Sequence, residues 1–243
     1  MNLVFFDFDD TLTRLDTTFP LGAFVTGQRK MRLRLPFLMV AAGMLKVRLL
    51  SNHGFKRVFA RLFMRGLTIE NARQLARDFF ETHLDALADE EVLGRLRAHV
   101  DRGDQVYLVS ANFACLLEPL VARWSLAGVI ATEVDFTAGA CTGGIQGAAC
   151  HQQEKLRRVV DRFGPRAVAG AVAYGNEDDA PLLGAVGTAF LIRRAKPPLL
   201  ERLRRWRRLT SGPLNQQQDL TSVRTIEPFC ASGSLPAVAP VDA

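Results

Sequence analysis

The sequence is poor in cysteine, and its four cysteines (Cys115, Cys141, Cys150 and Cys230) show no paired spacing. Secreted domains held together by disulfides carry paired cysteines, so this class is excluded and a reducing compartment is indicated. The amino terminus shows no signal-peptide pattern, because an apolar strand is expected to begin already at Leu3. These two absences together predict a cytoplasmic protein.

A hydrophobic run of membrane-spanning length is also missing. The 11 residues Leu35–Leu45 are uncharged and lie between Arg34 and Lys46, but a helix that crosses a bilayer needs roughly 20 apolar residues. Two placements of this run remain open, a buried helix or a helix that lies at an interface. Burial is the preferred prediction.

Acidic residues are missing from a long segment near the amino terminus. Residues 17–69 contain no Asp or Glu, although they carry ten Arg and Lys residues, and residues 193–208 hold eight basic residues against one acid. This uneven charge, within a net charge of +6, indicates a polyanionic partner: a phosphate-rich substrate, an anionic membrane surface or nucleic acid. Nucleic acid is unlikely on these patterns, because the basic stretches contain no nucleic-acid motif and no stacking aromatic beyond Trp206.

The clearest motif that is present begins with an apolar strand, expected from Leu3 to Asp7 and buried on both faces of a parallel sheet. Two carboxylates, Asp7 and Asp9, stand at its carboxyl end and are followed by Thr11. Such carboxylates can hold a hard divalent cation, and an aspartate can attack a phosphoryl group. The simpler interpretation, a strand that runs into an acidic helix-capping turn, is not excluded by this segment alone.

Three later segments favour the catalytic interpretation. Residues Asp7–Thr13 resemble the first motif of the haloacid dehalogenase-like phosphohydrolases, Asp-x-Asp-x-Thr-Leu-Thr. The other motifs of that family, a strand ending in Ser, a segment that supplies Lys and an acidic loop after a strand, are matched in order by Val106–Asn112, Cys150–Lys155 and Ala173–Pro181. The resemblance covers roughly residues 1–192 and is to the phosphoserine phosphatase-like subclass, which has a helical cap after the first motif.

The resemblance implies an α/β fold: a doubly wound parallel sheet, the Rossmann-like core of this family, with an inserted α-helical cap. The alternation of strand and helix patterns after residue 90 agrees with such a sheet, and Val168 to Tyr174 is predicted as one of its strands. The predicted parts are a core (1–15 and 90–195), a cap (16–89), a basic amphipathic segment (196–209) and a disordered tail (210–243).

The resemblance also implies the catalytic roles of a magnesium-dependent phosphomonoester hydrolase. Asp7 would be the nucleophile, and Asp9 would protonate the leaving oxygen and later accept a proton from water. Ser110 would donate a hydrogen bond to a phosphoryl oxygen, while Lys155 would supply positive charge to the transferring group.

Mg²⁺ is the implied cofactor, with ligands from the side chain of Asp7, the main-chain carbonyl of Asp9 and the fourth motif. The family usually has Gly-Asp in that motif with a second Asp four residues later, whereas this chain has Asn176 in the first place and Asp178 and Asp179 in a loop one residue shorter. Asn176 is a candidate neutral ligand through its amide oxygen. Asp179 is the first choice for the acidic ligand or its support, and Asp178 is the alternative; both acids could instead simply cap a helix.

Two substrate classes remain open. Asp16 lies nine residues after Asp7, and in phosphoserine phosphatases, which look similar here, an acid at that offset recognises an amino group. Arg57 or Arg61 is then the candidate to pair with a substrate carboxylate, and Asn112 is a further candidate for substrate binding.

The basic and apolar cap is similar instead to the branch of the family that includes phosphatidylglycerophosphate phosphatases. That similarity implies a lipid head group as substrate and a peripheral position at the inner face of the membrane. A non-catalytic relative that binds polyanions is the least favoured prediction, and the sequence makes no prediction of the oligomeric state.

Overall fold

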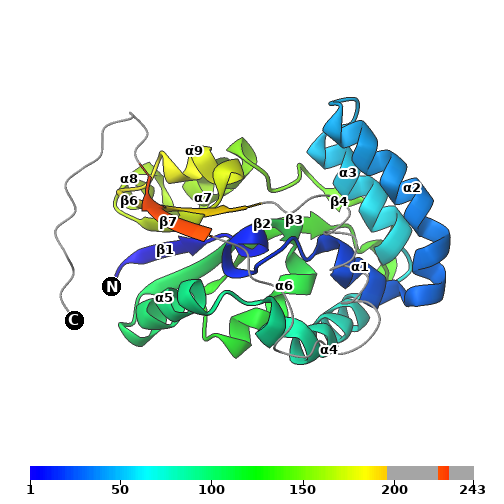
Figure 1. Cartoon of the computed structure of the whole chain (residues 1–243), viewed down its shortest axis with the longest axis horizontal. Coiled ribbons are helices and arrows are strands. Elements are labelled where there is room, and N and C mark those ends of the chain that lie inside the picture. The colour runs from blue at the N-terminus through cyan, green and yellow to red at the C-terminus, as the bar shows by residue number, and fades with distance from the viewer. Residues whose placement is uncertain (196–223, 230–243) are drawn as a thin grey trace.

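The computed structural model describes residues 1–195 and 224–229 and centres on a seven-stranded sheet in the order β4-β3-β2-β1-β5-β6-β7 (Figure 1). Neighbouring strands from β3 to β6 pair in parallel, whereas β4 and β7 pair antiparallel at the two edges. The strands are β1 (Leu3–Phe6), β2 (Gln105–Phe113), β3 (Gly128–Val134), β4 (Ile145–Gln146), β5 (Val172–Gly175), β6 (Thr188–Arg194) and β7 (Arg224–Pro228).

Helices cover both faces of this sheet (Figure 1). One face carries α5 (Glu90–Asp101) and α6 (Ala114–Arg123), and the other carries α7 (Gln153–Phe163), α8 (Pro165–Ala169) and α9 (Ala180–Leu183). The side chains of β1 alternate between the two cores, with Val4 and Phe6 in one and Phe5 in the other. A strand buried on both faces needs this continuous apolar run, and the predicted doubly wound α/β fold is confirmed.

The central position of β1 decides where its acidic end lies. Phe6 is in register with Leu108 of β2 and with Tyr174 of β5, and the rings of Phe6 and Tyr174 stack with centroids 4.3 Å apart. The chain then makes one tight turn over Phe8–Leu12. The carboxyl ends of three parallel strands therefore meet beside this turn, where α/β sheets bind their ligands.

A helical segment is inserted between that turn and α5. Its main helices are α1 (Thr18–Thr26), α2 (Gln28–Lys46), α3 (Asn52–Phe59) and α4 (Ile69–Leu87). The two linkers that join it to the core run side by side, because Thr13 forms an antiparallel bridge with Ala88. These helices lie within residues 16–89, the range predicted for the cap. None of the helices in the described part of the chain is long and apolar enough to cross a membrane.

The preference for burial of Leu35–Leu45 was wrong for half of the helix. Leu38 and Ala41 of α2 are buried, but Phe37 and Val40 are 69% and 64% exposed. The reason is geometric: α2 is an outer helix of the cap, and the described elements cover only one of its sides (Figure 1). A run without charges shows no polar face, so the sequence pattern did not distinguish the two sides.

Two further predictions differ from the structure. Val168, predicted to open a strand, lies in α8, and the strand begins only at Val172. Arg224–Pro228, predicted as part of a disordered tail, form β7 and pair with β6; their side chains alternate between half-buried and exposed, as the two faces of a strand require. The predicted basic segment 196–209 and the rest of the predicted tail lie outside the described residues.

Candidate active site

Asp7 follows directly on β1, and its side chain is only 6% exposed. Lys155 Nζ donates a hydrogen bond to Asp7 Oδ1 at 2.6 Å, and Thr11 Oγ1 donates one to Oδ2 at 2.9 Å. The backbone N–H of Asp7 donates to the carbonyl of Tyr174 at 2.9 Å. Both carboxylate oxygens are therefore oriented, and a buried cation compensates the buried negative charge. A nucleophile held in this way needs little reorganisation before it attacks.

Lys155 lies in the first turn of α7 and bridges two carboxylates, since its Nζ also lies 2.5 Å from Asp179 Oδ1. Burial lowers the pKa of Lys155, but the charges of Asp179 and Asp7 outweigh burial and raise it, so the ammonium stays protonated. Burial and the charge of Asp7 raise the pKa of Asp179, and Lys155 opposes this. Two carboxylates share one cation, which leaves the cluster short of positive charge.

The loop before α7 is strained. Gln152 has φ 47° and ψ −116°, a conformation that residues other than glycine rarely adopt. Its carbonyl accepts the backbone N–H of Lys155 at 3.0 Å, so the strained turn sets the start of the helix that carries the lysine. Half-buried His151 stands beside it; burial lowers the pKa of His151, and the charge of Asp178 acts against burial.

Asn176 follows β5 and reaches across to the first motif. Its Nδ2 lies 3.0 Å from Asp7 Oδ2 and 3.1 Å from the main-chain oxygen of Asp9. Its own backbone N–H donates to Asp179 Oδ2 at 2.9 Å. The fourth motif is thus bound to the first by the side chain that stands where the family usually has an aspartate.

These contacts test whether a magnesium ion fits. Asp7 Oδ2 and the Asp9 carbonyl converge on a single point, now taken by the Asn176 amide nitrogen, and oxygen atoms of these two kinds are the ligands Mg²⁺ prefers. The Asn176 amide oxygen accepts the backbone N–H of Asp178 at 2.9 Å; a half rotation of the amide would give up this bond and direct the oxygen to the same point. Within residues 1–195 and 224–229 no three His, Cys, Asp or Glu side chains form a metal cluster, so a main-chain oxygen and a neutral amide would complete the set. The residues fit the ion.

The two aspartates of the fourth motif differ in burial. Asp178 is exposed and Asp179 is 2% exposed. The contacts of Asp179 with Lys155 and with the N–H of Asn176 engage both of its oxygens. This geometry favours Asp179 over Asp178, and in the role of support for Lys155 and Asn176 rather than as a direct ligand.

The side chain of Asp9 is held by the start of the cap and the end of β2, and not by Lys155. Thr17 donates to Asp9 Oδ1 through its N–H at 2.8 Å and its hydroxyl at 2.6 Å, and Asn112 Nδ2 donates to Oδ2 at 3.1 Å. Burial and the charge of Asp16 raise the pKa of Asp9 to about 7, against the hydrogen bonds from Thr17. A carboxyl group with this pKa can both give and take a proton near neutral pH.

Ser110 and Asn112 lie at the end of β2, where the register with β3 shifts between Ser110 and Phe113. The side chain of Ser110 is buried, and its oxygen accepts the backbone N–H of Asn112 at 3.1 Å. The hydroxyl proton can therefore be donated to a ligand. Asn112 contacts Asp9 and Thr17 instead, so it orients the predicted acid–base residue. Thr17 is a site residue that the sequence analysis missed.

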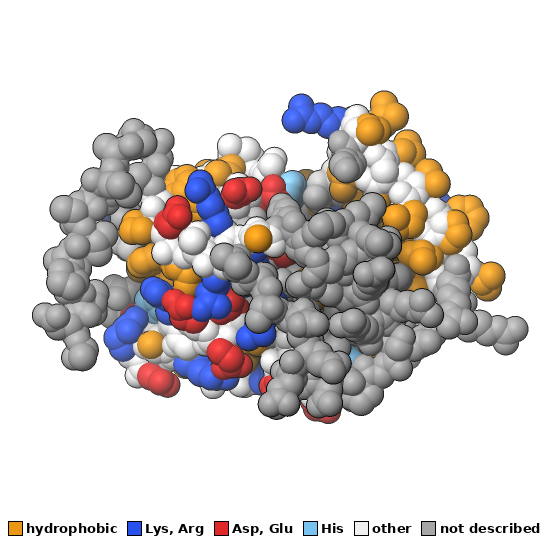
Figure 2. Space-filling model, in the orientation of Figure 1, with side chains coloured by type: hydrophobic (Ala, Val, Ile, Leu, Met, Phe, Trp, Pro, Cys, Tyr) orange, Lys and Arg blue, Asp and Glu red, His pale blue; other side chains and the backbone are white. Residues whose placement is uncertain are grey.

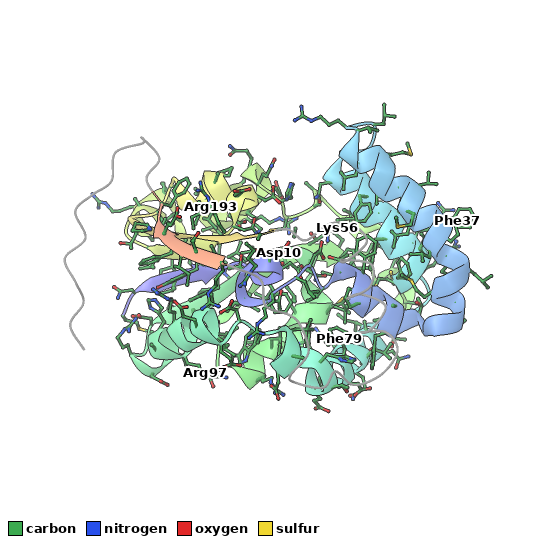
Figure 3. All side chains as sticks on the ribbon, in the orientation of Figure 1. Asp10, Phe37, Lys56, Phe79, Arg97 and Arg193 are labelled. Atoms are coloured by element: carbon green, nitrogen blue, oxygen red, sulfur yellow. The ribbon has the colours of Figure 1, made fainter. Side chains whose placement is uncertain are left out.

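The cap contributes a lysine that the sequence analysis also missed. Lys56 of α3 is 5% exposed, and its Nζ lies 3.4 Å from Thr18 Oγ1, on the side of the cap that faces the core (Figure 3). Burial lowers the pKa of Lys56, while the nearby charges of Asp16 and Asp9 raise it. Arg57 and Arg61, the predicted partners of a substrate carboxylate, are exposed.

The available signal for Lys56 was the rarity of lysine in a chain that prefers arginine, since only five of 31 basic residues are Lys. Lys155, the other buried lysine of the site, carries the same signal. It marks positions where a compact, strongly charged ammonium is needed rather than a planar guanidinium.

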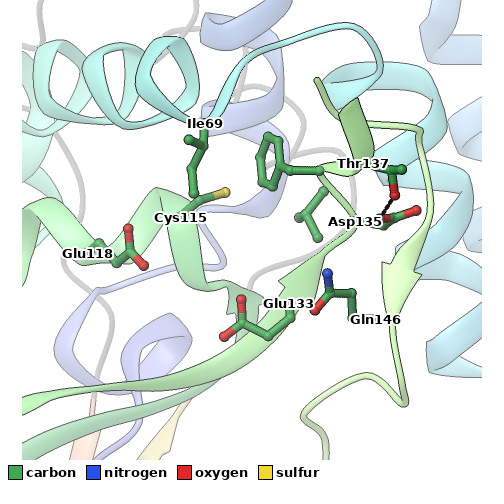
Figure 4. Close-up of a pocket in the computed structure, with 9 residues that line it drawn as sticks. Ile69, Cys115, Glu118, Glu133, Asp135, Thr137 and Gln146 are labelled. Atoms are coloured by element: carbon green, nitrogen blue, oxygen red, sulfur yellow. Dashed lines mark hydrogen bonds between the residues drawn. The ribbon is translucent and has the colours of Figure 1, made fainter. Parts of the chain in front are cut away.

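A pocket of about 290 Å³ lies elsewhere, between α4, α6 and the end of β3 (Figure 4). Its lining includes Ile69, Cys115, Glu118, Glu133 and Gln146 and none of the predicted site residues. Burial and the charge of Glu118 raise the pKa of Glu133. This pocket is separate from the Asp7 cluster and is not the candidate active site.

A profile of the haloacid dehalogenase-like hydrolase family matches residues 4–184, which contain all four motifs. Protein CicA of Caulobacter vibrioides is 28% identical over 199 residues, which are 80% of this chain and 88% of that protein. Phosphoserine phosphatase SerB1 of Mycobacterium tuberculosis is 27% identical over 217 residues, which are 83% of this chain and 68% of that protein.

Two solved structures are similar in fold. A protein of unknown function from Bordetella pertussis Tohama I has a TM-score of 0.68 at 22% identity and covers 85% of this chain and 95% of its own. A substrate-bound phosphoserine phosphatase has a TM-score of 0.53 at 18% identity and covers 77% of this chain and 84% of its own. At these identities the likeness concerns the fold alone.

Proposed function

We propose that this chain, which belongs to the haloacid dehalogenase-like hydrolase family because the family profile matches residues 4–184, hydrolyses phosphomonoesters. The reaction would proceed through an aspartyl-phosphate on Asp7. The observation that carries the proposal is the bridge from Lys155 to Asp7 and Asp179, beside an Asp9 whose pKa is raised to about 7. One oriented carboxylate and one proton-exchanging carboxyl group are the two parts that this reaction needs.

In the first step, an oxygen of Asp7 attacks phosphorus while the bond from phosphorus to the leaving oxygen breaks. Protonated Asp9 gives its proton to that oxygen, so an alcohol departs. Lys155 stays charged and balances the negative charge on the phosphoryl oxygens, and the Ser110 hydroxyl donates a hydrogen bond to one of them.

In the second step, Asp9 is ionised and accepts a proton from a water molecule that attacks phosphorus. The bond between phosphorus and the Asp7 oxygen breaks, phosphate leaves, and Asp9 is again protonated. Thr17 and Asn112 hold the two oxygens of Asp9, so its position is fixed in both steps.

Asp7 Oδ2, the Asp9 carbonyl and the Asn176 amide are the proposed holders of Mg²⁺, with Asp179 supporting Asn176. The ion, when bound, neutralises charge on the phosphoryl group. A neutral amide in place of a carboxylate gives this chain one negative charge fewer at the ion than the usual motif of the family.

The proposal is tested by hydrolysis of an aryl phosphate with Mg²⁺, with EDTA and with the variant Asp7→Asn. We expect turnover only for the unaltered chain with Mg²⁺. Turnover that survives either EDTA or the substitution would refute the mechanism.

The proposed substrate class is a phosphorylated small molecule, with Asp16 and Lys56 as the cap residues that contact the part of the substrate beyond its phosphate. Both lie close enough to Asp9 for their charges to act on its pKa. The phosphoserine phosphatase among the relatives makes an amino acid phosphate the first compound to assay.

A lipid head group is the second candidate, together with a peripheral position at the inner membrane face, and it is favoured by the exposed apolar side of α2. A panel of amino acid phosphates, sugar phosphates and short-chain lipid phosphates separates the two, with the ratio of kcat/KM values as the readout. A preference of at least tenfold for the lipid compounds would replace the first candidate by the second.

A further inference from the structure

The outer side of α2 is both apolar and exposed. Apart from Met1, every large hydrophobic side chain that is exposed in residues 1–195 and 224–229 lies between Leu33 and Leu49. We define the α2 stripe as Leu33, Phe37, Val40, Met44 and Val47, which are 39% to 71% exposed. The spacing of four, three and four residues places the first four on one side of α2, and Val47 follows directly after the helix.

This side is turned away from the other elements that the structure describes. Met31, Leu38 and Ala41 lie on the other side of α2 and are buried, where the helix packs on α1 and α3. Phe37 points outward from the cap in Figure 3, and hydrophobic side chains follow the outer edge of α2 in Figure 2. The stripe is therefore a continuous apolar surface rather than a set of scattered side chains.

The charges around the stripe have one sign. Lys30 in the first turn of α2 and Arg48 just after its end are both exposed, so a cation stands at each end. Exposed Arg57, Arg61 and Arg65 belong to the same part of the cap, and no acidic residue occurs from position 17 to position 69. An apolar helix side with cations beside it is typical of helices that lie in the surface of an anionic bilayer.

A second copy of the chain fits this surface less well. A symmetric dimer would place the same residues against each other, so Lys30 and Arg48 of one copy would face a cap segment with no acid to pair with them. Anionic lipid head groups supply the missing counter-charge, and the acyl boundary accepts the apolar side chains.

We propose that the α2 stripe docks on the surface of an anionic lipid bilayer, with α2 parallel to the membrane plane. The helix lies on the bilayer and does not cross it, because its other side is buried in the cap. α2 belongs to the same cap that carries Lys56, so docking places the outer side of the cap on the membrane while Lys56 faces the core. The inference does not depend on the substrate class proposed above.

The test is co-sedimentation of the full chain with vesicles. One set consists of phosphatidylcholine, and in the other about one third of the lipid is phosphatidylglycerol. We expect binding to the anionic set at low salt, weaker binding at high salt because exposed charges are screened, and much weaker binding to the neutral set.

Matched variants distinguish binding through the α2 stripe from non-specific adsorption to vesicles. Phe37→Asn combined with Val40→Asn should lower the partition coefficient at least about tenfold, since two large apolar side chains no longer enter the lipid. Met39→Asn, on the same helix beside the stripe, should change it by less than about threefold. Arg48→Gln should lower it by about fivefold, and Arg77→Gln on α4 should leave it unchanged. Thermal unfolding and aryl phosphate turnover show whether each variant is folded.

The outcomes separate this inference from the proposed function. No binding to anionic vesicles at low salt overturns it, and so does binding that the double substitution leaves unchanged. A dimer detected by light scattering, and converted to a monomer by the same double substitution without any vesicle binding, would assign the stripe to a second copy. Vesicle binding by a chain that hydrolyses no phosphate would sustain the inference and refute the function.

Discussion

The core and the cap meet at the candidate active site, and their contributions to it differ. On the core side, Lys155 lies 2.6 Å from Asp7 and 2.5 Å from Asp179, and all three side chains are buried. On the cap side, Lys56 Nζ lies 3.4 Å from Thr18 Oγ1 and 5.5 Å from the centre of the Phe113 ring. The core side is a closed network of ion pairs, whereas the cap side holds a buried cation by few contacts.

This difference teaches that the two sides have different tasks. Parallel strands fix the core residues to within their register, which suits a nucleophile that must not move. The cap is joined to the core by two linkers and packs on it through helices such as α4 on α6, rather than through strand register, which suits a part that selects and encloses the substrate. Changes on the core side should therefore lower kcat for every substrate, and changes on the cap side should alter KM and the order of substrates.

The strongest challenge to the comparison is the nucleophile. Asp7→Asn keeps the size of the side chain but removes its charge, so kcat for an aryl phosphate should fall by at least about 10³-fold. Asp178→Asn, which removes the same charge from an exposed position, should retain most of the activity. Equal losses in the two variants would show that net charge, and not the carboxylate of Asp7, is what matters.

The next largest effect is expected at the bridging cation. Lys155→Met removes the positive charge beside the transferring group and leaves Asp7 and Asp179 to repel each other, so kcat should fall by about 10²- to 10³-fold on all substrates. Arg157→Met, on an exposed turn of the same helix, is the control. A Lys155 variant with an altered KM and a normal kcat would show that Lys155 binds substrate, as proposed for the cap residues, and does not act in the chemical step.

The cap side is tested by Lys56→Met. We expect KM to rise by about tenfold for substrates with a negative charge beyond the phosphate, with little change in kcat. The KM for an aryl phosphate whose aryl group carries no charge should change little. Arg57→Met, exposed one residue away, should have no such effect. A fall in kcat that is the same for all substrates would end the distinction between the two sides.

The proposed metal site can be tested by a substitution that should strengthen Mg²⁺ binding. Asn176→Asp places a third carboxylate beside Asp7 and Asp179, so the Mg²⁺ concentration for half-maximal activity should fall by about tenfold. Without the ion, the added repulsion should lower the melting temperature, and Mg²⁺ should restore more of it than in the unaltered chain. A melting temperature that does not respond to Mg²⁺ in either protein would argue against these ligands.

The smallest expected effect concerns the junction of core and cap. Asp89 is buried and caps the amino-terminal end of α5, where its carboxylate oxygen accepts the N–H of Glu91 at 3.1 Å. It also forms ion pairs with Arg194 at 2.8 Å and with Arg224 at 2.6 Å. Burial raises the pKa of Asp89, but the hydrogen bond and charge of Arg194, with help from Arg224, outweigh it and hold the pKa below its usual value.

The depressed pKa of Asp89 gives the sign of a pH effect. Its stabilisation is present above the pKa of the unfolded state and is lost as the pH falls through the lower pKa of the folded state. Asp89→Asn should therefore lower the free energy of unfolding by about 1–3 kcal/mol at neutral pH, and denaturant titrations should show the difference shrinking in acid. A difference that stays constant down to strongly acidic pH would exclude the ionised carboxylate as its cause.

Local sequence accounts for much of the site but not for its cap side. The four motifs each end a strand or begin a helix, and such positions are fixed by short apolar runs and by their register in the sheet. Which of Lys56, Arg57 and Arg61 faces the core depends instead on the rotation of α3 against its neighbours. One residue along a helix turns the side chain by roughly 100°, and three basic residues in one segment give no local signal that selects among them.

The sequence by itself determined the alternation of strands and helices in the core, the family and the position of Asp7 at the end of a buried strand, because these follow from apolar patterns and short motifs. Only the tertiary structure decided that Lys56 enters the site, that Phe37 stays exposed and that residues 224–228 close the edge of the sheet. Each of those outcomes depends on how segments distant in the sequence pack against one another, and the local sequence pattern does not specify that packing.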